Sequence, residues 1–199
     1  MARLQPRQPR GLDLVRRFTY RVAKRMYGRP MEPNQIMAHH KPLLLGYGAV
    51  AMAHERYSKS VAHRLKLLAM IRASQLMGCE WCMDFGSFLA QRSGIEAETL
   101  RDLSRWRDSP RFDELDRLVL EYSEAMTRTP VVVTDRLFAA LREHFDERQM
   151  IELTMSISLE NMYSRTNWAL GIGSEGYSEG MYCVRPESEA ERADAVVAG

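Results

Sequence analysis

Apolar residues recur at intervals of three and four residues along most of the chain, the spacing that places side chains on one face of an α-helix. The pattern is clearest in three segments, residues 64–77, 113–126 and 147–170. The residues that would cap these helices are Ser58 or Ser60, Asp113 and Asp146. One strand-like stretch, residues 129–133, has no partner strand. The pattern therefore predicts an all-α protein of about six to eight helices.

Two prolines and changes in composition divide the chain into three parts. Residues 1–33 form a basic amphipathic segment, which ends at Pro30 and Pro33 because proline interrupts a helix. Residues 34–183 carry the other helical segments and are predicted to form one helical domain. Residues 184–199 are acidic and rich in small residues, so we expect a disordered tail.

The charge of the N-terminal segment is strongly one-sided, with nine arginine or lysine residues against Asp13 before Pro30. A basic amphipathic helix can lie on an anionic membrane or on nucleic acid, and an arginine-rich start also fits a transit peptide. Its tyrosines and methionines favour contact with protein, and no base-stacking pattern of aromatic and basic residues is present. We expect an arm that packs on a second copy in a homo-oligomer, with no nucleic acid and with membrane contact as the less favoured alternative.

The overall composition is that of an ordinary globular protein. The chain has 199 residues, 45% of them hydrophobic and 27% charged, with a net charge of +2. No apolar run approaches the ~18 residues of a membrane span. Three cysteines, two of them in one short motif, are typical of a reducing compartment. We therefore expect a cytoplasmic protein.

The strongest chemical signal is the C-x-x-C pair Cys79 and Cys82, which stands between two predicted helices. In a helical setting this spacing brings both sulfurs to one face, where they can form a disulfide or open to a dithiol. The positive end of a helix lowers the pKa of a nearby thiol. A thiolate with a second thiol in reach can attack a peroxide and be resolved by its neighbour, or exchange with another disulfide.

Two simpler interpretations compete with redox chemistry. A structural zinc site needs four ligands, but Cys183 and the five histidines are scattered, so we expect no metal and no other cofactor. Buried cysteines can also be plain core residues. A thioredoxin fold would need strands around the motif, and none is predicted, so the redox pair would belong to a helical protein.

Two stretches of the sequence resemble the carboxymuconolactone decarboxylase and alkylhydroperoxidase D superfamily. They are residues 65–103, with the motif Ser74-Gln75-x-x-Gly78-Cys79-x-x-Cys82, and residues 118–173. The resemblance implies an alkylhydroperoxidase D-like helical bundle, here with an N-terminal helical arm, that assembles as a dimer, trimer or hexamer. Peroxidase members of the superfamily reduce hydroperoxides with the C-x-x-C pair, whereas decarboxylase members act on a muconolactone and lack it.

The resemblance also implies roles for single residues. It makes Cys82 the cysteine that attacks the peroxide and Cys79 the cysteine that resolves it. Family peroxidases carry a proton relay of one glutamate and one histidine, and the corresponding positions here hold Leu67 and Gly86. Because such proton transfer contributes typically about 10²–10⁴-fold, another group would have to replace the relay.

Several residues could supply the missing proton transfer. Asp84 is the nearest carboxylate after Cys82 and is our catalytic candidate, although it could equally interact with the helix dipole. The other candidates for proton transfer are Glu80, His54 and His63.

A second group of residues could shape a substrate pocket. Trp81, between the cysteines, is one candidate, with core packing as its simpler role. Asn161 is the other; it follows Glu160 within an apolar run, and a buried polar pair needs hydrogen-bond partners. We expect the partners of Glu160 and Asn161 to be structural. An inert role is also expected for Cys183.

These observations favour a thiol-dependent hydroperoxidase of the peroxiredoxin type that uses a dithiol–disulfide pair. Its partners would be a small hydroperoxide and an external dithiol reductant. The alternatives are a decarboxylase-like lyase acting on a small lactone, and a non-catalytic redox-sensing helical module that has lost the proton relay.

Overall fold

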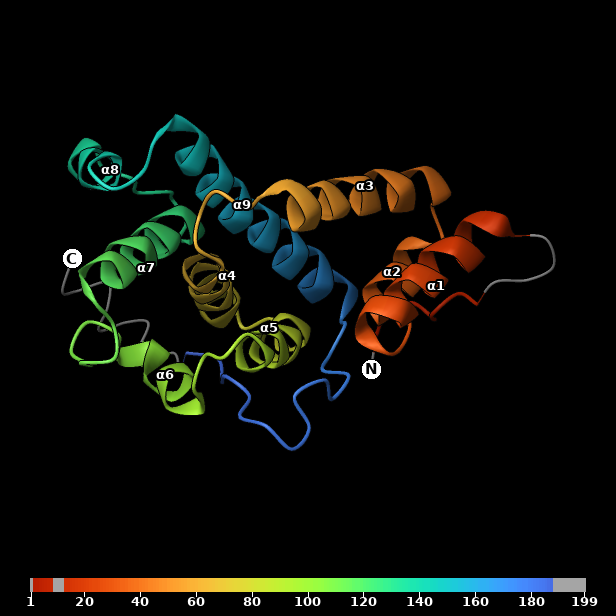
Figure 1. Cartoon of the computed structure of the whole chain (residues 1–199). Helices are drawn as coiled ribbons and strands as arrows, with labels where there is room; N and C mark the ends of the chain where they lie inside the picture. Colours follow the sequence, from red (N-terminus) through yellow and green to blue (C-terminus); the bar gives the residue numbers. More distant parts are fainter. Residues whose placement is uncertain (1, 9–12, 188–199) are drawn as a thin grey trace. The chain divides into compact units, whose positions relative to one another are not determined.

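The computed structural model describes residues 2–8 and 13–187, which form helices and no β-strand (Figure 1). The all-α prediction is confirmed. The elements are α1 (Leu14–Tyr27), α2 (Glu32–Met37), α3 (Lys41–Tyr57), α4 (His63–Met77), α5 (Glu80–Arg92), α6 (Ala97–Arg101), η1 (Asp102–Arg105), α7 (Glu114–Thr127), α8 (Asp135–Arg142) and α9 (Glu147–Leu170). None of these helices is both long enough and apolar enough to cross a membrane. Arg10 and residues 188–199 of the expected tail lie outside the described residues.

Local capping explains most of the helix starts. The predicted aspartate caps of α7 and α9 are confirmed. At α9, Asp146 and Gln149 form a reciprocal capping box, with distances of 2.8 and 3.0 Å between the backbone nitrogens and the side-chain oxygens. The predicted serine cap of α4 is wrong, because α4 begins without a side-chain cap. Instead, the backbone N–H groups of Ser60 and Val61 donate to the Glu152 carboxylate.

The chain divides into two compact units, which are described separately. Unit 1 comprises Met1–Ser58 and Asn167–Gly173, and unit 2 comprises Lys59–Thr166 and Ser174–Gly199. Unit 1 contains α3 as well as the residues of the expected arm.

A small apolar cluster holds unit 1 together. Its buried members are Tyr20 on α1, Ala38 after α2 and Leu44 on α3. Arg16 fixes the same region, because its guanidinium donates two hydrogen bonds to the Ala38 carbonyl, at 3.1 and 3.2 Å, and pairs with Asp13. One basic side chain of α1 is therefore used inside the unit.

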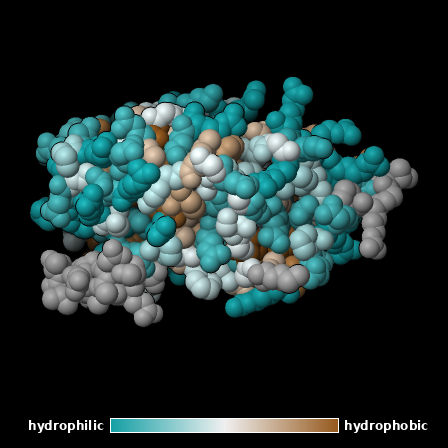
Figure 2. All heavy atoms as spheres, turned by 90° about the horizontal axis from the view of Figure 1, so that it is seen from below, coloured by the Kyte–Doolittle hydropathy of each residue, from teal (hydrophilic) through white to brown (hydrophobic). Residues whose placement is uncertain are grey.

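Helix α3 is unusual among the described helices because it is apolar and yet buries only Leu44. Its exposed large apolar side chains are Leu43, Leu45, Val50, Met52 and Tyr57. The face of the molecule in Figure 2 is mainly hydrophilic, with apolar groups showing at several places between the hydrophilic ones. Contiguous apolar surface on a helix indicates contact with another molecule more often than contact with water.

Helix α4 is the centre of unit 2, and its residues 65–75 are almost all buried. Leu68 and Ile71 pack into a cluster with α5 and α6. Leu65 and Ala69 pack into a second cluster with α7, α8 and α9. Helix α4 therefore contributes buried side chains to both clusters. Each fully buried leucine stabilises the fold by roughly 1.5–3 kcal/mol.

After α9 the chain returns across α5 as an irregular segment, residues 174–187, which we name the C-terminal strap. Three polar side chains on one face of α5 bind it: Asp84, Ser87 and Gln91. Ser87 accepts from the Val184 backbone N–H at 3.0 Å. Gln91 donates to the Tyr182 carbonyl at 2.7 Å and accepts from its N–H at 3.1 Å. The strap is thus hydrogen-bonded along α5.

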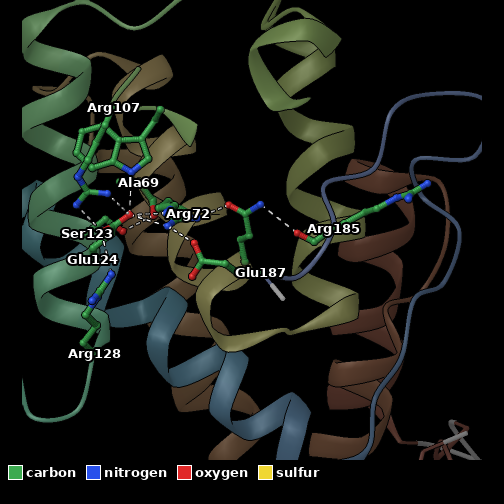
Figure 3. A network of polar contacts seen from close by, with 10 residues as sticks. Ala69, Arg72, Arg107, Ser123, Glu124, Arg128, Arg185 and Glu187 are labelled. Carbon is green, nitrogen blue, oxygen red and sulfur yellow. Dashed lines mark hydrogen bonds and ion pairs between the residues drawn. The ribbon is translucent and has the colours of Figure 1, made fainter. Parts of the chain in front are cut away.

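The strap ends in a buried network of charges around Arg72 of α4, which lies between two carboxylates (Figure 3). Arg72 donates to Glu124 of α7 at 2.8 Å and to Glu187 at 2.6 Å. Glu124 also accepts from Trp106 and Arg107, at 2.7 and 2.8 Å. Burial would raise the pKa of Glu124, but Arg72 and the other donors outweigh it and lower the pKa to about 2. Residues 184–187, which we assigned to the expected tail, therefore belong to the packed part of the chain.

Candidate active site

The two cysteines of the C-x-x-C motif lie where α4 gives way to α5. Gly78 ends α4 in the left-handed region, with φ of 68°, and Cys79 is the N-cap of α5. The Cys79 sulfur accepts from the Cys82 backbone N–H at 3.3 Å, and the two sulfurs form a disulfide. The pair therefore occupies the positive end of α5, where a helix favours a thiolate once the disulfide is reduced.

Both sulfurs are buried in the form described. Cys79 is 2% exposed and Cys82 is 5% exposed. No group of three or more His, Cys, Asp or Glu side chains that could hold a metal ion occurs among the described residues. Because both cysteines are buried, the side chains that contact their sulfurs belong to the interior of unit 2.

One polar chain reaches Cys82 from α9. The Ser164 hydroxyl lies 3.4 Å from the Cys82 sulfur and 2.9 Å from the Glu160 carboxylate. Glu160 and Ser164 are one helical turn apart, so both side chains project from the same face of α9. Burial raises the pKa of Glu160 to about 8, and the hydrogen bond with Ser164 only partly opposes this. A neutral carboxylic acid is thus linked to the sulfur by one hydroxyl.

Leu67 and Gly86 stand at the two positions where the resemblance implies a glutamate and a histidine. Leu67 is 5% exposed and belongs to the apolar cluster of α4 and α5. Gly86 faces the same contact, and a Cβ there would come within 3.0 Å of Ile71 Cγ1. The Ile71 side chain would therefore have to move by a few tenths of an ångström to admit any side chain at position 86.

The structure places Asp84 in the strap contact. It is 1% exposed, and five hydrogen bonds of 2.7 to 3.0 Å reach it from the Ser174 and Ser178 hydroxyls and from the N–H groups of Glu175, Tyr177 and Ser178. Burial would raise the pKa of Asp84, but these hydrogen bonds, Ser178 foremost, outweigh it and lower the pKa. An ionised carboxylate with five donors anchors the strap.

Trp81 packs with aromatic side chains beside the strap. Its ring stacks on Phe85, with centroids 4.9 Å apart, and meets Tyr177 edge-on at 6.1 Å. Its indole N–H donates to the Glu175 carboxylate at 2.6 Å. The structure therefore places Trp81 in an aromatic cluster that holds the start of the strap against α5.

A cavity of about 400 Å³ lies next to this cluster, lined by Glu80 and Met83 of α5 and by strap residues 174 and 181–186. Glu80 is exposed at the first turn of α5. Asn161 is not part of this lining; its amide donates at 3.0 Å to the Thr127 hydroxyl and to the Ile157 carbonyl. Asn161 therefore ties α9 to α7, the structural use we expected.

The two candidate histidines differ in their placement. His63 is exposed at the first position of α4, and the cysteines follow the last. At a rise of about 1.5 Å per residue, the length of α4 separates His63 from the pair, so His63 is not brought to the sulfurs. His54 lies on α3, in unit 1.

Sequence reasoning missed the link between Glu160, Ser164 and Cys82. A usable signal was present, because Glu160 and Ser164 stand at i and i+4 on α9 and therefore lie on one face of the helix. Nothing local in the sequence ties that segment to a cysteine 82 residues earlier. The strap residues Ser174 and Ser178, whose hydroxyls donate to Asp84, were also missed.

The helical bundle and its disulfide define a class of protein, and comparison with known sequences gives the family. Residues 44–125 match the carboxymuconolactone decarboxylase family. The chain is 31% identical over 125 residues to the uncharacterized protein YdfG of Bacillus subtilis, covering 61% of this chain and 85% of YdfG. It is 39% identical over 113 residues to the uncharacterized protein YnjA of Escherichia coli, covering 56% of this chain but only 62% of YnjA, less than two thirds of that protein. The chain belongs to the carboxymuconolactone decarboxylase family, and the resemblance is confirmed.

Solved structures show the same fold. An uncharacterized peroxidase-related protein from Silicibacter has a TM-score of 0.80 at 15% identity, covering 91% of this chain and 95% of that chain. A cysteine-to-alanine variant of the debrominase Bmp8, in complex with 2,3,4-tribromopyrrole, has a TM-score of 0.73 at 16% identity and covers both chains fully. The alkylhydroperoxidase D-like fold is therefore confirmed. At these identities the likeness concerns the fold alone.

Proposed function

We propose that the protein is a thiol-dependent hydroperoxidase in which Cys82 attacks the peroxide and Cys79 resolves the product. The observation that carries this proposal is the Cys79–Cys82 disulfide at the N-terminus of α5, with a polar chain leading from Cys82 to a buried carboxyl. The family supports it, because the resemblance of the motif implies peroxidase members that use the same pair.

The proposed reaction balances in three steps. The Cys82 thiolate attacks one peroxide oxygen, so that an S–O bond forms, the O–O bond breaks, and the leaving alkoxide takes up a proton to become an alcohol. The Cys79 thiol then attacks the sulfenic acid, which forms the disulfide and releases water. An external dithiol reduces the disulfide by exchange and is itself oxidised. Because both sulfurs are buried, peroxide and dithiol reach them through local opening.

The proposed assembly is a homo-oligomer. The exposed apolar side chains of α3 support it, since they would be covered by a second copy of the chain. The expected division into arm and helical domain remains a prediction, as does a tail from residue 188 onward.

The test is peroxide consumption by the dithiol-reduced protein. With dithiol present, Cys82→Ser should reduce the rate to that of the dithiol alone. Cys79→Ser, reduced and then freed of dithiol before peroxide is added, should consume about one equivalent and then stop with a sulfenic acid on Cys82. Cys183→Ser is the matched thiol control, because Cys183 is not in the disulfide, and it should keep the wild-type rate. Equal rates in all three variants would contradict the proposal.

Reductive debromination is the second candidate, favoured by the fold shared with Bmp8 in complex with a bromopyrrole. The Cys82 thiolate would take bromine from the ring carbon, which gains a proton, and Cys79 would displace bromide as the disulfide forms. Bromide release from 2,3,4-tribromopyrrole, without consumption of hydroperoxide, would favour this reaction. A lactone-directed lyase would instead keep its activity in both cysteine variants, and a redox-sensing module would form the disulfide with no turnover in either assay.

A further inference from the structure

The serine between Glu160 and Cys82 has two neighbours but one hydrogen to donate. Its hydroxyl is within hydrogen-bond distance of the Glu160 carboxylate, at 2.9 Å, and of the Cys82 sulfur, at 3.4 Å. A serine hydroxyl is one donor with two acceptor lone pairs. In the disulfide form the Cys82 sulfur can only accept, so both contacts can be hydrogen bonds at once only when Glu160 is protonated and donates to Ser164, which then donates to the sulfur.

We propose that Glu160, acting through Ser164, is the proton relay of Cys82 and takes the place of the glutamate and histidine that this chain lacks. The inference rests on the proposed chemistry of Cys82. It assigns Glu160 and Ser164 as positioning and proton-transfer residues, and it explains why a carboxyl is kept in an apolar part of the bundle.

The surroundings of Glu160 suit this role because no cation among the described residues holds its carboxylate in the ionised form. Glu160 forms no ion pair among the described residues, and its pKa is raised to about 8 by burial, with only Ser164 acting in the opposite direction. The charged and titratable groups of the elements around α9 in unit 2 have other partners: Lys66 with Glu152, Arg72 with Glu124 and Glu187, Asp84 with the strap, Glu175 with Trp81, Arg142 with Glu147, and Tyr122 with Thr154.

The same helix contains a contrasting pair two turns earlier, Glu152 and Ser156. The Glu152 carboxylate pairs with Lys66 at 2.7 Å. Burial alone would raise the pKa of Glu152, but Lys66 and the N–H groups of residues 60 and 61 lower it. The Ser156 hydroxyl donates to the Glu152 backbone carbonyl at 2.8 Å. A glutamate and serine at the same spacing thus serve structure when a lysine is present and leave a protonated acid when it is absent.

The proton path of one turnover follows from this geometry. After reduction, the Cys82 thiol gives its proton through Ser164 to ionised Glu160, which produces a thiolate hydrogen-bonded to Ser164 and a neutral carboxyl. The thiolate attacks the peroxide, and the carboxyl returns the proton through Ser164 to the alkoxide that leaves. Glu160 ends ionised, as it began, and no proton is gained or lost by the relay. Because one proton is shared, Cys82 and Glu160 titrate as a pair.

The experiment measures the reactivity of Cys82 in the absence of peroxide. In the full chain carrying Cys79→Ser and Cys183→Ser, Cys82 is the remaining thiol, and its alkylation rate by iodoacetamide is followed from pH 5 to 10. With Glu160 present the profile should show two steps, one of them near the carboxyl's pKa of about 8. Glu160→Gln should leave one step, since an amide cannot take the proton.

Peroxide turnover by the otherwise native chain supplies the second readout. Glu160→Gln and Ser164→Ala should each lower kcat/KM by about 10²–10⁴-fold, the usual contribution of a proton-transfer group. Ser164→Thr keeps the hydroxyl and should restore most of the rate. Ser156→Ala removes the matched serine on the same helix and should change neither readout.

The outcomes separate the relay from the peroxidase activity. If Glu160→Gln leaves both the alkylation profile and peroxide turnover as in wild type, the relay is wrong while the peroxidase proposal stands. If the alkylation profile changes as expected but the wild type consumes no peroxide, the relay exists and the proposed activity is wrong. A change in Ser156→Ala equal to that in Ser164→Ala would also overturn the relay, because the effect would then not be specific to the serine that contacts Cys82.

Discussion

Two buried glutamates of unit 2 show opposite electrostatics. Glu124 on α7 and Glu160 on α9 are 3% and 7% exposed. Glu124 faces Arg72 and further donors, and its pKa is lowered to about 2. Glu160 has the hydroxyl of Ser164 as its hydrogen-bond partner, and its pKa is raised to about 8. Burial is similar in the two cases, so the presence of a cation decides the charge.

The difference also separates a structural site from a chemical one. Glu124, Arg72 and Glu187 join α7, α4 and the strap (Figure 3). Because the pKa of Glu124 is lowered to about 2, its carboxylate stays ionised at all ordinary pH values. A carboxyl whose pKa lies near neutrality can give and take a proton at that pH. The molecule thus places its fixed charges in the network around Arg72 and its exchangeable proton beside Cys82.

The largest expected effect is on the pH dependence of stability in Glu160→Gln. In the wild type, the unfolded chain ionises Glu160 above its usual pKa of 4.5 while the folded chain does not until about pH 8. The contribution of Glu160 is therefore fully present below pH 4.5 and is lost as pH rises to 8. This pKa difference corresponds to about 5 kcal/mol. Urea unfolding of the oxidised protein should show the wild type losing stability relative to Glu160→Gln over this window. If the free energy of unfolding changes with pH in the same way in both proteins, the raised pKa is contradicted.

The next effect in size is the destabilisation caused by Arg72→Met. Removing the cation leaves Glu124 and Glu187 buried without it, and breaking a buried ion pair on one side costs about 3–5 kcal/mol. The loss should be greatest above pH 4.5, where Glu124 is ionised in both the folded and the unfolded chain, and should diminish as pH falls toward 2 because protonation of Glu124 removes its unpaired charge. Urea unfolding at several pH values measures it. A destabilisation independent of pH would indicate lost packing instead of lost charge.

The helices of this fold could be predicted from the sequence, whereas the state of the site could not. Apolar spacing and the aspartate caps predicted α7 and α9, and Cys79 and Cys82 were apparent because their contact is local. Asp84 was selected for its nearness to Cys82 in the chain. Its role depends on donors about ninety residues away, in the C-terminal strap.

Long-range contacts also explain why the sequence did not distinguish Glu160 from a structural glutamate. Its sequence neighbourhood resembles that of Glu152 on the same helix, with a serine four residues later in both cases. The difference lies in Lys66 of α4, which reaches Glu152 from 86 residues away. The charge of a buried acid is therefore a property of the packed helices, and one sequence segment does not contain it.

The smallest expected effect, and the finest test of the comparison, is Ser164→Ala. Ser164 lowers the pKa of Glu160, so its removal should raise that pKa above about 8 and move the alkaline loss of stability to higher pH. One hydrogen bond is worth about 1 kcal/mol, which corresponds to a change of less than about one pH unit. Trp106→Phe removes one of several donors to Glu124 and should change the acid limb less, because Arg72 and Arg107 remain. Unfolding curves of the oxidised variants measure both shifts. Ser156→Ala, which removes a hydroxyl that donates to the Glu152 backbone carbonyl, should move neither limb. An equal shift in Ser164→Ala and Ser156→Ala would mean that the Glu160 carboxyl does not depend on its single hydroxyl partner, and the contrast with Glu124 would then rest on burial alone.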